Sequence, residues 1–164
     1  MPDIAIDDPR VIRMRTFSKG YGLAGLRVGY ALGAVPLIRA FDKVRNHFAL
    51  GRVAQAGAIA ALADADWLAR VRREVEAGRA RIEAIAAENG LRALPSATNF
   101  VTVDCGRDGD FARSLLQQMV ARGVFVRMPG IAPLDRCIRI SVGRAAEMDV
   151  LAEVLPQALA TVRG

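Results

Sequence analysis

The fold is decided by a stretch near the start of the chain, which reads Thr16-Phe17-Ser18-Lys19-Gly20-Tyr21-Gly22-Leu23-Ala24-Gly25-Leu26-Arg27-Val28-Gly29-Tyr30. Within it, a lysine follows two hydroxyl side chains, stands in a glycine-rich turn and has an arginine eight residues later. A lysine amine can form a Schiff base with an aldehyde. Hydroxyl groups and a guanidinium can bind a phosphate, and glycines let the backbone approach a ligand closely. The residue types therefore suit a ligand that carries both an aldehyde and a phosphate.

Pyridoxal phosphate (PLP) is such a ligand. We expect Lys19 to form the Schiff base, and the hydroxyls of Thr16 and Ser18 and the guanidinium of Arg27 to bind the phosphate. The alternative is an ordinary strand-turn-strand with a solvated lysine, which leaves the glycine spacing and the paired hydroxyls unexplained. Lysine is also scarce, since Lys19 and Lys43 are the two lysines among 23 basic residues.

The same stretch resembles the lysine-attachment signature of class-II (fold type I) PLP-dependent aminotransferases, and residues 26–30 fit the histidinol-phosphate aminotransferase branch. Other segments resemble this family in the family's order. Residues 45–48 with 54–56 resemble the segment that joins the family's two domains. Residues 95–100 resemble the start of a small-domain strand, and residues 137–143 resemble the strand with the carboxylate-binding arginine. The resemblance therefore covers nearly the whole chain.

The resemblance implies an α/β fold made of two unequal parts. Residues 1–35 would be a remnant of the PLP-binding large domain, made of its last strands and carrying the lysine motif. Residues 36–50 would form an interdomain helix. Residues 51–164 would form a complete α+β small domain, with helices packed on a small sheet. Two strands cannot bury themselves, so we expect the apolar edge of the first part to be exposed, paired with another chain or disordered.

Periodicity and turn residues predict the individual elements. The run 27–32 is nearly continuous in apolar residues, as buried parallel strands are. Asn89-Gly90 is expected to stop a long helix, and Pro156 to kink or shorten the last one. Strands are predicted over 11–17, 27–32, 99–103, 124–127 and 137–142. Helices are predicted from 36 to about 44 or beyond, over 52–62, from 64 or 66 to about 88, from 108 or 110 to 123, and over 145–162.

Two arginines are candidates for binding the substrate. Arg139 lies between Ile138 and Ile140 in a predicted strand, so it should point to the face opposite both. By resemblance it would bind the substrate carboxylate; the alternative is a solvated arginine on the polar face of the sheet. Arg127 lies near the position where the histidinol-phosphate branch has an arginine on the substrate phosphate, and this match is looser.

Composition excludes several other classes of function. The net charge is +6, but basic and acidic residues alternate over 70–83 and aromatic residues make up 5%, which argues against nucleic-acid binding. Cys105, Cys137 and the single histidine, His47, are too scattered for a metal site. Isolated cysteines, the absence of a signal core and the absence of a bilayer-length apolar run predict a soluble, cytoplasmic protein without a membrane partner.

The resemblance also implies an incomplete active site. In the family, the acid on the pyridine nitrogen, a nearby tyrosine, a stacking aromatic and a phosphate-binding turn precede the lysine strand, and Asp3, Asp7 and Asp8 do not match that acid's sequence context. We therefore expect the isolated chain to bind PLP weakly and to be weakly active or inactive. The expected partners are a small amino-acid or amino-phosphate substrate and either a second copy or a complementing large-domain chain.

Three functions remain open at this point. The first is transamination, with the amino group of histidinol phosphate or of an amino acid passing to 2-oxoglutarate. The second is decarboxylation by a PLP enzyme of the same scaffold. The third is a non-catalytic remnant that acts as an interaction module.

Overall fold

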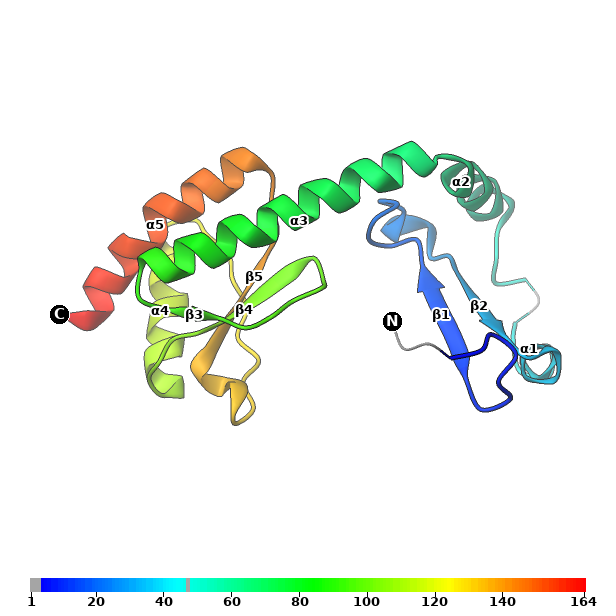
Figure 1. Cartoon of the computed structure of the whole chain (residues 1–164), viewed down its shortest axis with the longest axis horizontal. Helices are drawn as coiled ribbons and strands as arrows, with labels where there is room; N and C mark the ends of the chain where they lie inside the picture. The colour runs from blue at the N-terminus through cyan, green and yellow to red at the C-terminus, as the bar shows by residue number, and fades with distance from the viewer. Residues whose placement is uncertain (1–3, 47) are drawn as a thin grey trace. The chain divides into compact units, whose positions relative to one another are not determined.

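The computed structural model describes residues 4–46 and 48–164, so His47 lies outside the described residues. The chain divides into two compact units, which we call unit 1 (Met1–Arg72) and unit 2 (Arg73–Gly164). One helix, α3 (Ala65–Glu88), begins in unit 1 and ends in unit 2 (Figure 1).

Unit 1 contains an antiparallel hairpin. Its strands are β1 (Ile12–Thr16) and β2 (Gly29–Gly33), and a short 3-10 helix, η1 (Ala24–Leu26), lies between them. The helices α1 (Val35–Phe41) and α2 (Arg52–Ala63) follow. Both predicted strands are thus confirmed, whereas α1 ends three residues before the predicted end at residue 44.

The hairpin is only partly buried. Phe17, Val28 and Ala54 form a small core, while Met14 on β1 is 71% exposed and Tyr30 on β2 is 37% exposed. Exposure, one of the three outcomes expected for the apolar edge, is thus seen in the single chain, and pairing of this edge with another chain stays a prediction. The comparison of residues 27–32 with a buried parallel strand is wrong, because β2 pairs antiparallel with β1 in a two-stranded sheet.

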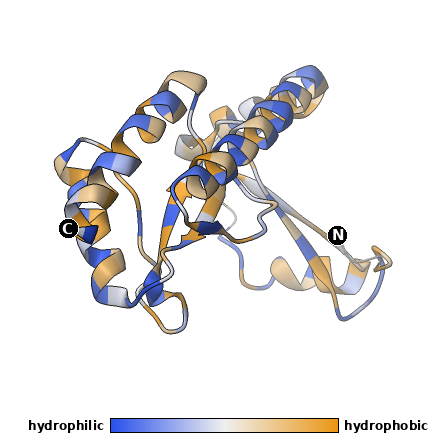
Figure 2. Ribbon diagram, turned by 60° about the vertical axis from the view of Figure 1, so that its left-hand side comes forward, coloured by the Kyte–Doolittle hydropathy of each residue, from blue (hydrophilic) through white to orange (hydrophobic). Residues whose placement is uncertain are grey.

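Unit 2 is built on a three-stranded antiparallel sheet in the order β3-β4-β5, with three helices around it (Figure 1). Along α3, hydrophilic and hydrophobic residues are interspersed, as Figure 2 shows. The elements after α3 are β3 (Arg92–Ala93), β4 (Phe100–Asp104), α4 (Gly109–Ala121), the 3-10 helix η2 (Leu134–Arg136), β5 (Cys137–Ser141) and α5 (Ala145–Arg163).

The core of unit 2 lies on one face of this sheet. Val101 and Val103 on β4 and Ile138 and Ile140 on β5 are buried there against side chains of α3, α4 and α5. Because side chains alternate along a strand, the residues between them point to the opposite face. Arg139 is one of these, as predicted from its two isoleucine neighbours.

Two glycines end helices as the sequence predicts. Gly90 (φ +71°) follows α3 and Gly123 (φ +81°) follows α4. After α4, the amide of Gly123 donates to the carbonyl of Val120 and the amide of Val124 donates to that of Met119, at 2.9 and 3.0 Å. This pair of hydrogen bonds is the Schellman arrangement, which needs a left-handed residue at the position of the glycine.

That arrangement also explains an incorrect prediction. Residues 124–127 do not form a strand, because Val124 bonds back to α4 and only Arg127 makes a bridge to β5. The third strand is instead the two-residue β3, which was not predicted. Pro156 lies inside α5, which runs through it to Arg163 and is not shortened.

Within the two described stretches, none of the helices combines the length and the apolar character that crossing a bilayer requires.

Candidate functional site

The turn that carries Lys19 is anchored by the buried ring of Phe17. The amide of Phe17 donates to the carbonyl of Val28 (3.3 Å), and its carbonyl accepts from the amide of Leu23 (2.9 Å). The Phe17 ring also lies 4.8 Å from the ring of Tyr21. The hairpin end is therefore fixed on both sides of the lysine.

Lys19 itself opens a tight turn. Its carbonyl accepts a hydrogen bond from the amide of Gly22 (2.8 Å), and Gly22 has a φ of +69°. This conformation favours glycine, since other residues meet a steric penalty there. The lysine side chain is exposed. An exposed amine on a constrained turn is accessible to an aldehyde.

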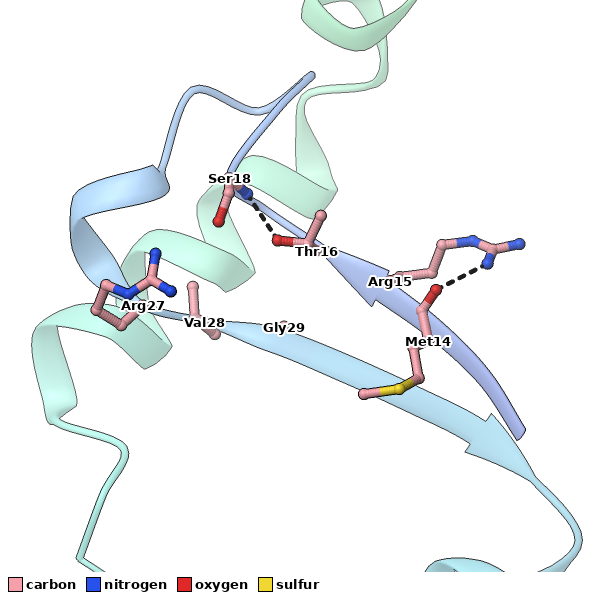
Figure 3. A pocket seen from close by; sticks show the side chains of 7 residues that line it. All are labelled: Met14, Arg15, Thr16, Ser18, Arg27, Val28 and Gly29. Carbon is pink, nitrogen blue, oxygen red and sulfur yellow. Dashed lines mark hydrogen bonds between the residues drawn. The ribbon is translucent and has the colours of Figure 1, made fainter. Parts of the chain in front are cut away.

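An open hollow of about 370 Å³ lies at the end of the hairpin. Lys19 is not among its lining residues but directly follows one of them, Ser18. The hollow brings together three of the predicted site residues, Thr16, Ser18 and Arg27, from β1, the loop after it and the residue after η1 (Figure 3). The lining comprises Met14, Arg15, Thr16, Ser18, Arg27, Val28 and Gly29.

The polar groups of the hollow suit an anion. The Ser18 amide donates to Oγ1 of Thr16 (3.1 Å), so the two hydroxyl residues form one local unit. Figure 3 shows the guanidinium of Arg15 directed to the carbonyl of Met14 and away from Arg27. Among the described lining residues none is acidic. Hydroxyl donors and a guanidinium without a competing carboxylate fit a phosphate group.

Arg27 has an unusual backbone conformation. Its φ and ψ are +53° and +44°, and it is the non-glycine residue with positive φ among those the structure describes. Its Nη1 donates to the carbonyl of Ala24 at 2.8 Å, which holds the side chain next to the hollow. Left-handed backbone at a long side chain costs about 1–2 kcal/mol, and such strain clusters at ligand sites.

The strand pairing next to Arg27 requires a glycine. A Cβ at Gly29 would lie 2.7 Å from the carbonyl oxygen of Arg15 on the neighbouring strand. Real Cβ atoms do not approach backbone that closely, so only glycine lets β2 pair with β1 at this point. The glycine thereby keeps Arg27 beside the hydroxyls of Thr16 and Ser18.

The other two predicted site residues lie together in unit 2. Arg127 and Arg139 face each other across an antiparallel bridge, in which each amide donates to the other residue's carbonyl, at 3.0 and 2.6 Å. Residues paired in this way project their side chains on the same face of a sheet. The Arg139 guanidinium lies over the ring of Phe100, 4.8 Å from its centroid. Phe100 was not singled out from the sequence as a separate contributor.

These two guanidiniums are free to bind an anion. In residues 4–46 and 48–164, neither Arg127 nor Arg139 forms an ion pair with a carboxylate. Two neighbouring positive groups without a counter-charge suit a carboxylate or a phosphate. The structure therefore brings the five anion-binding candidates into two groups, one in each unit.

The remaining charged cluster of unit 2 is satisfied internally. Asp104 is buried at the end of β4 and accepts hydrogen bonds from Arg136 and Arg92. Burial raises the pKa of the neighbouring Cys105 thiol to about 11 and also raises the pKa of Cys137. Among the described residues no group of three or more His, Cys, Asp or Glu side chains could hold a metal ion.

The sequence of this chain is similar to those of known aminotransferases. The family model described as aminotransferase class I and II matches residues 3–155. Histidinol-phosphate aminotransferase 2 of Pseudomonas fluorescens is 41% identical over 154 residues, which are 92% of this chain and 41% of that protein. Histidinol-phosphate aminotransferase 1 of Mesorhizobium japonicum is 38% identical over 97% of this chain and 43% of its own length. The chain thus spans about two-fifths of the curated relatives it matches.

Solved structures show the same fold. Histidinol-phosphate aminotransferase from Sinorhizobium meliloti, solved with pyridoxal 5'-phosphate, superposes on 95% of this chain and 43% of its own, with a TM-score of 0.90 and 55% identity. L-threonine-O-3-phosphate decarboxylase from Porphyromonas gingivalis superposes on 91% of this chain and 46% of its own, with a TM-score of 0.75 and 22% identity. The fold alone therefore accommodates more than one reaction, but the family model covers most of the sequence, and the chain belongs to the class I and II aminotransferase family.

Proposed function

We propose that this chain contributes the Schiff-base lysine and the anion-binding residues of a PLP-dependent aminotransferase. The reaction would pass the amino group of histidinol phosphate, or of an amino acid, to 2-oxoglutarate. The observation that carries this proposal is the hollow lined by Thr16, Ser18 and Arg27, since the exposed Lys19 directly follows the lining residue Ser18 in the chain. The sequence identity to histidinol-phosphate aminotransferases supports the same reaction.

Lys19 would have two tasks. PLP, when bound, supplies an electron-withdrawing ring that eases removal of a proton from the substrate's α carbon. The Nζ of Lys19 would hold the cofactor through its aldehyde carbon. Once released by the substrate amine, the same Nζ would carry the proton between the substrate α carbon and the C4' carbon of the cofactor.

The phosphate ligands would keep the cofactor in place while Lys19 is released. The Arg27 guanidinium can bind two phosphate oxygens, and the Ser18 hydroxyl can donate to a third. Thr16 already accepts from the Ser18 amide, which leaves its hydroxyl hydrogen for the phosphate. Without these contacts the cofactor would be free to leave each time its bond to lysine opens.

Arg127 and Arg139 would bind the substrate's anionic groups. The reaction alternates between a phosphate monoester, in histidinol phosphate, and the carboxylates of 2-oxoglutarate. A pair of guanidiniums on one sheet face can bind either type of anion. We propose that Arg139 binds the carboxylate and Arg127 the phosphate.

The lysine assignment is tested by reductive labelling of the 164-residue chain. The chain is incubated with PLP and reduced with borohydride, and the pyridoxyl adduct is mapped by peptide mass spectrometry. We expect near-stoichiometric labelling at Lys19 and its loss in Lys19→Ala, with Lys43 as an internal comparison of equal chemistry. Equal labelling of Lys43 and the N-terminus, unchanged in the variant, would show that Lys19 does not form a specific site.

The reaction is tested by complementation, because the chain spans two-fifths of its relatives. The part of the Pseudomonas fluorescens relative that this chain does not match would be co-expressed with it. Glutamate formed from histidinol phosphate and 2-oxoglutarate would support transamination, and carbon dioxide released from an amino acid would support a decarboxylase instead. A stable complex, as a heterodimer or a dimer of such pairs, that catalyses neither reaction would support the interaction module.

A further inference from the structure

The turn that carries Lys19 makes a hydrogen bond to a residue far along the chain. The indole Nε1 of Trp67, in the first turn of α3, donates to the carbonyl of Gly20 at 3.0 Å. Both residues belong to unit 1. The contact joins the residue next to Lys19 to an element outside the hairpin.

Gly20 also packs closely against this helix. A Cβ at Gly20 would lie 3.0 Å from Cδ1 of Leu68, which is tighter than ordinary van der Waals contact. The Lys19 carbonyl is bonded inside the turn, to the amide of Gly22. The Gly20 carbonyl is thus held by Trp67 of α3, whereas the Lys19 carbonyl is held within the hairpin. The first bond restrains the peptide plane between Gly20 and Tyr21, and the second restrains the plane between Lys19 and Gly20.

Trp67 is itself held in place. Asp64 caps α3, because its carboxylate accepts a hydrogen bond from the Trp67 amide at 2.9 Å. The Arg70 guanidinium stacks on the indole, 4.6 Å from the ring centroid. Trp67 is 40% exposed, so its contacts rather than deep burial determine the orientation of its side chain.

We infer that Trp67 is a positioning residue for Lys19, acting through the Gly20 carbonyl to hold the turn in the conformation that presents the lysine amine beside the phosphate hollow. The inference rests on the proposed role of Lys19. It assigns to the start of α3 a part in building the cofactor site, although α3 contributes no lining residue to the hollow.

The test compares wild type with Trp67→Phe, which keeps an aromatic ring and removes the indole N–H. The rate of reductive PLP labelling at Lys19 is measured from pH 6 to pH 10. Loss of one hydrogen bond that orders the turn is expected to slow labelling about three- to tenfold. Phe125→Leu, which alters a largely exposed aromatic residue in unit 2, is the matched control and should label like wild type.

Two further measurements separate this inference from the role of Lys19. Amide hydrogen exchange at Gly20, Tyr21 and Gly22 should be faster in Trp67→Phe, while exchange in unit 2 stays the same. In wild type, Trp67 gives the single indole N–H resonance of the chain, and that resonance should shift when Lys19 is labelled. The resonance needs no variant, so it remains informative if Trp67→Phe folds poorly.

The outcomes are distinct. Slower labelling together with faster exchange confined to the turn supports the inference. Equal labelling profiles and equal exchange in both proteins overturn it, and so does an indole resonance unaffected by a label on Lys19. If wild type shows no specific labelling, the proposed role of Lys19 fails, and exchange in the turn alone decides whether Trp67 orders it.

Discussion

Replacing Asp104 with asparagine is expected to destabilise unit 2 at pH 7 and to have much less effect near pH 2. Asp104 ends β4 and is 6% exposed. Its Oδ1 accepts from Nε of Arg136 (2.8 Å) and from the Gly106 amide (2.9 Å). Its Oδ2 accepts from Nη2 of Arg136 (3.0 Å) and from Nη2 of Arg92 (3.2 Å). These bonds connect β4 to β3 and to the residue before β5.

The magnitude follows from the pKa of the carboxyl group. The hydrogen bonds from Arg136 lower the pKa of Asp104 from its ordinary 3.8 to about 2, against the opposing effect of burial. A difference of this size corresponds to roughly 2–3 kcal/mol of stabilisation in the charged state. The side chains of Arg92 and Arg136 are 76% and 44% exposed, and solvent screening reduces this to about 1–2 kcal/mol.

The sign follows from the lowered pKa. A carboxylate that ionises more readily in the folded state stabilises the fold above its unfolded pKa, near 4, and this contribution is lost as the pH falls through about 2. Wild type and Asp104→Asn should therefore differ by about 1–2 kcal/mol at pH 7 and converge between pH 4 and pH 2. The amide keeps one accepting oxygen and replaces the other with an NH2 donor, so the substitution removes the charge together with the hydrogen bonds that the second oxygen accepts.

The assay is urea unfolding followed by far-UV circular dichroism between pH 7 and pH 2, because urea, unlike guanidinium, does not screen charges. Asp149→Asn, at an exposed position on α5 in the same unit, is the control and should stay within about 0.5 kcal/mol of wild type at every pH. A stability difference for Asp104→Asn that is constant from pH 7 to pH 2 would refute the reasoning. An NMR titration placing the Asp104 carboxyl near pH 4 would refute it independently.

Three other substitutions test single contacts. Arg27→Gly relieves a left-handed backbone, so the Tm of thermal unfolding should stay equal or rise, and a lower Tm would contradict the strain argument. Because the guanidinium is lost, PLP labelling of Lys19 should slow several-fold. Phe100→Leu removes the ring under the Arg139 guanidinium. An NMR titration of the Arg139 Nε–H with inorganic phosphate should show about two- to fivefold weaker binding, and unchanged affinity would show that the ring does not help Arg139 to bind an anion. A Cβ at Gly78 would overlap Cγ1 of Val142, so Gly78→Ala should cost about 1–2 kcal/mol in urea unfolding, and adding Val142→Ala should recover most of it.

Where the signal is local, the sequence predicts both the fold and the site. The hydroxyl-lysine-glycine order places Thr16 and Ser18 at the end of β1 and brings Arg27 back beside them, because a short hairpin joins residues close in sequence. The position of Arg139 follows from alternation with two buried isoleucines. The placement of each of these side chains depends on residues within about a dozen positions in the sequence. A pattern of such short range therefore predicts the placement correctly.

The errors occur where local preference competes with a specific hydrogen bond. Val124 and Phe125 have high strand propensity, yet the Val124 amide bonds to the carbonyl of Met119 and closes α4. The two residues of β3 are too few to show any alternation, and Arg92 in this strand gains an ion pair with Asp104 that lies twelve residues away. Neither a cap nor a distant partner is visible in the periodicity of the sequence.

The contact between Trp67 and Gly20 marks the limit of what a sequence motif can show. The motif around Lys19 identifies the groups that could react with a cofactor, and its glycines explain why the turn is tight. It does not reveal what holds that turn, because the donor is 47 residues further along the chain, and its own orientation depends on Asp64 and Arg70. A mobile lysine and a constrained lysine would have the same motif, and they differ in how often the amine is placed beside the phosphate ligands. The long-range hydrogen bond therefore contributes an ordering of the site that the motif alone does not encode, and variants outside the motif can alter cofactor attachment without touching any group that binds the cofactor.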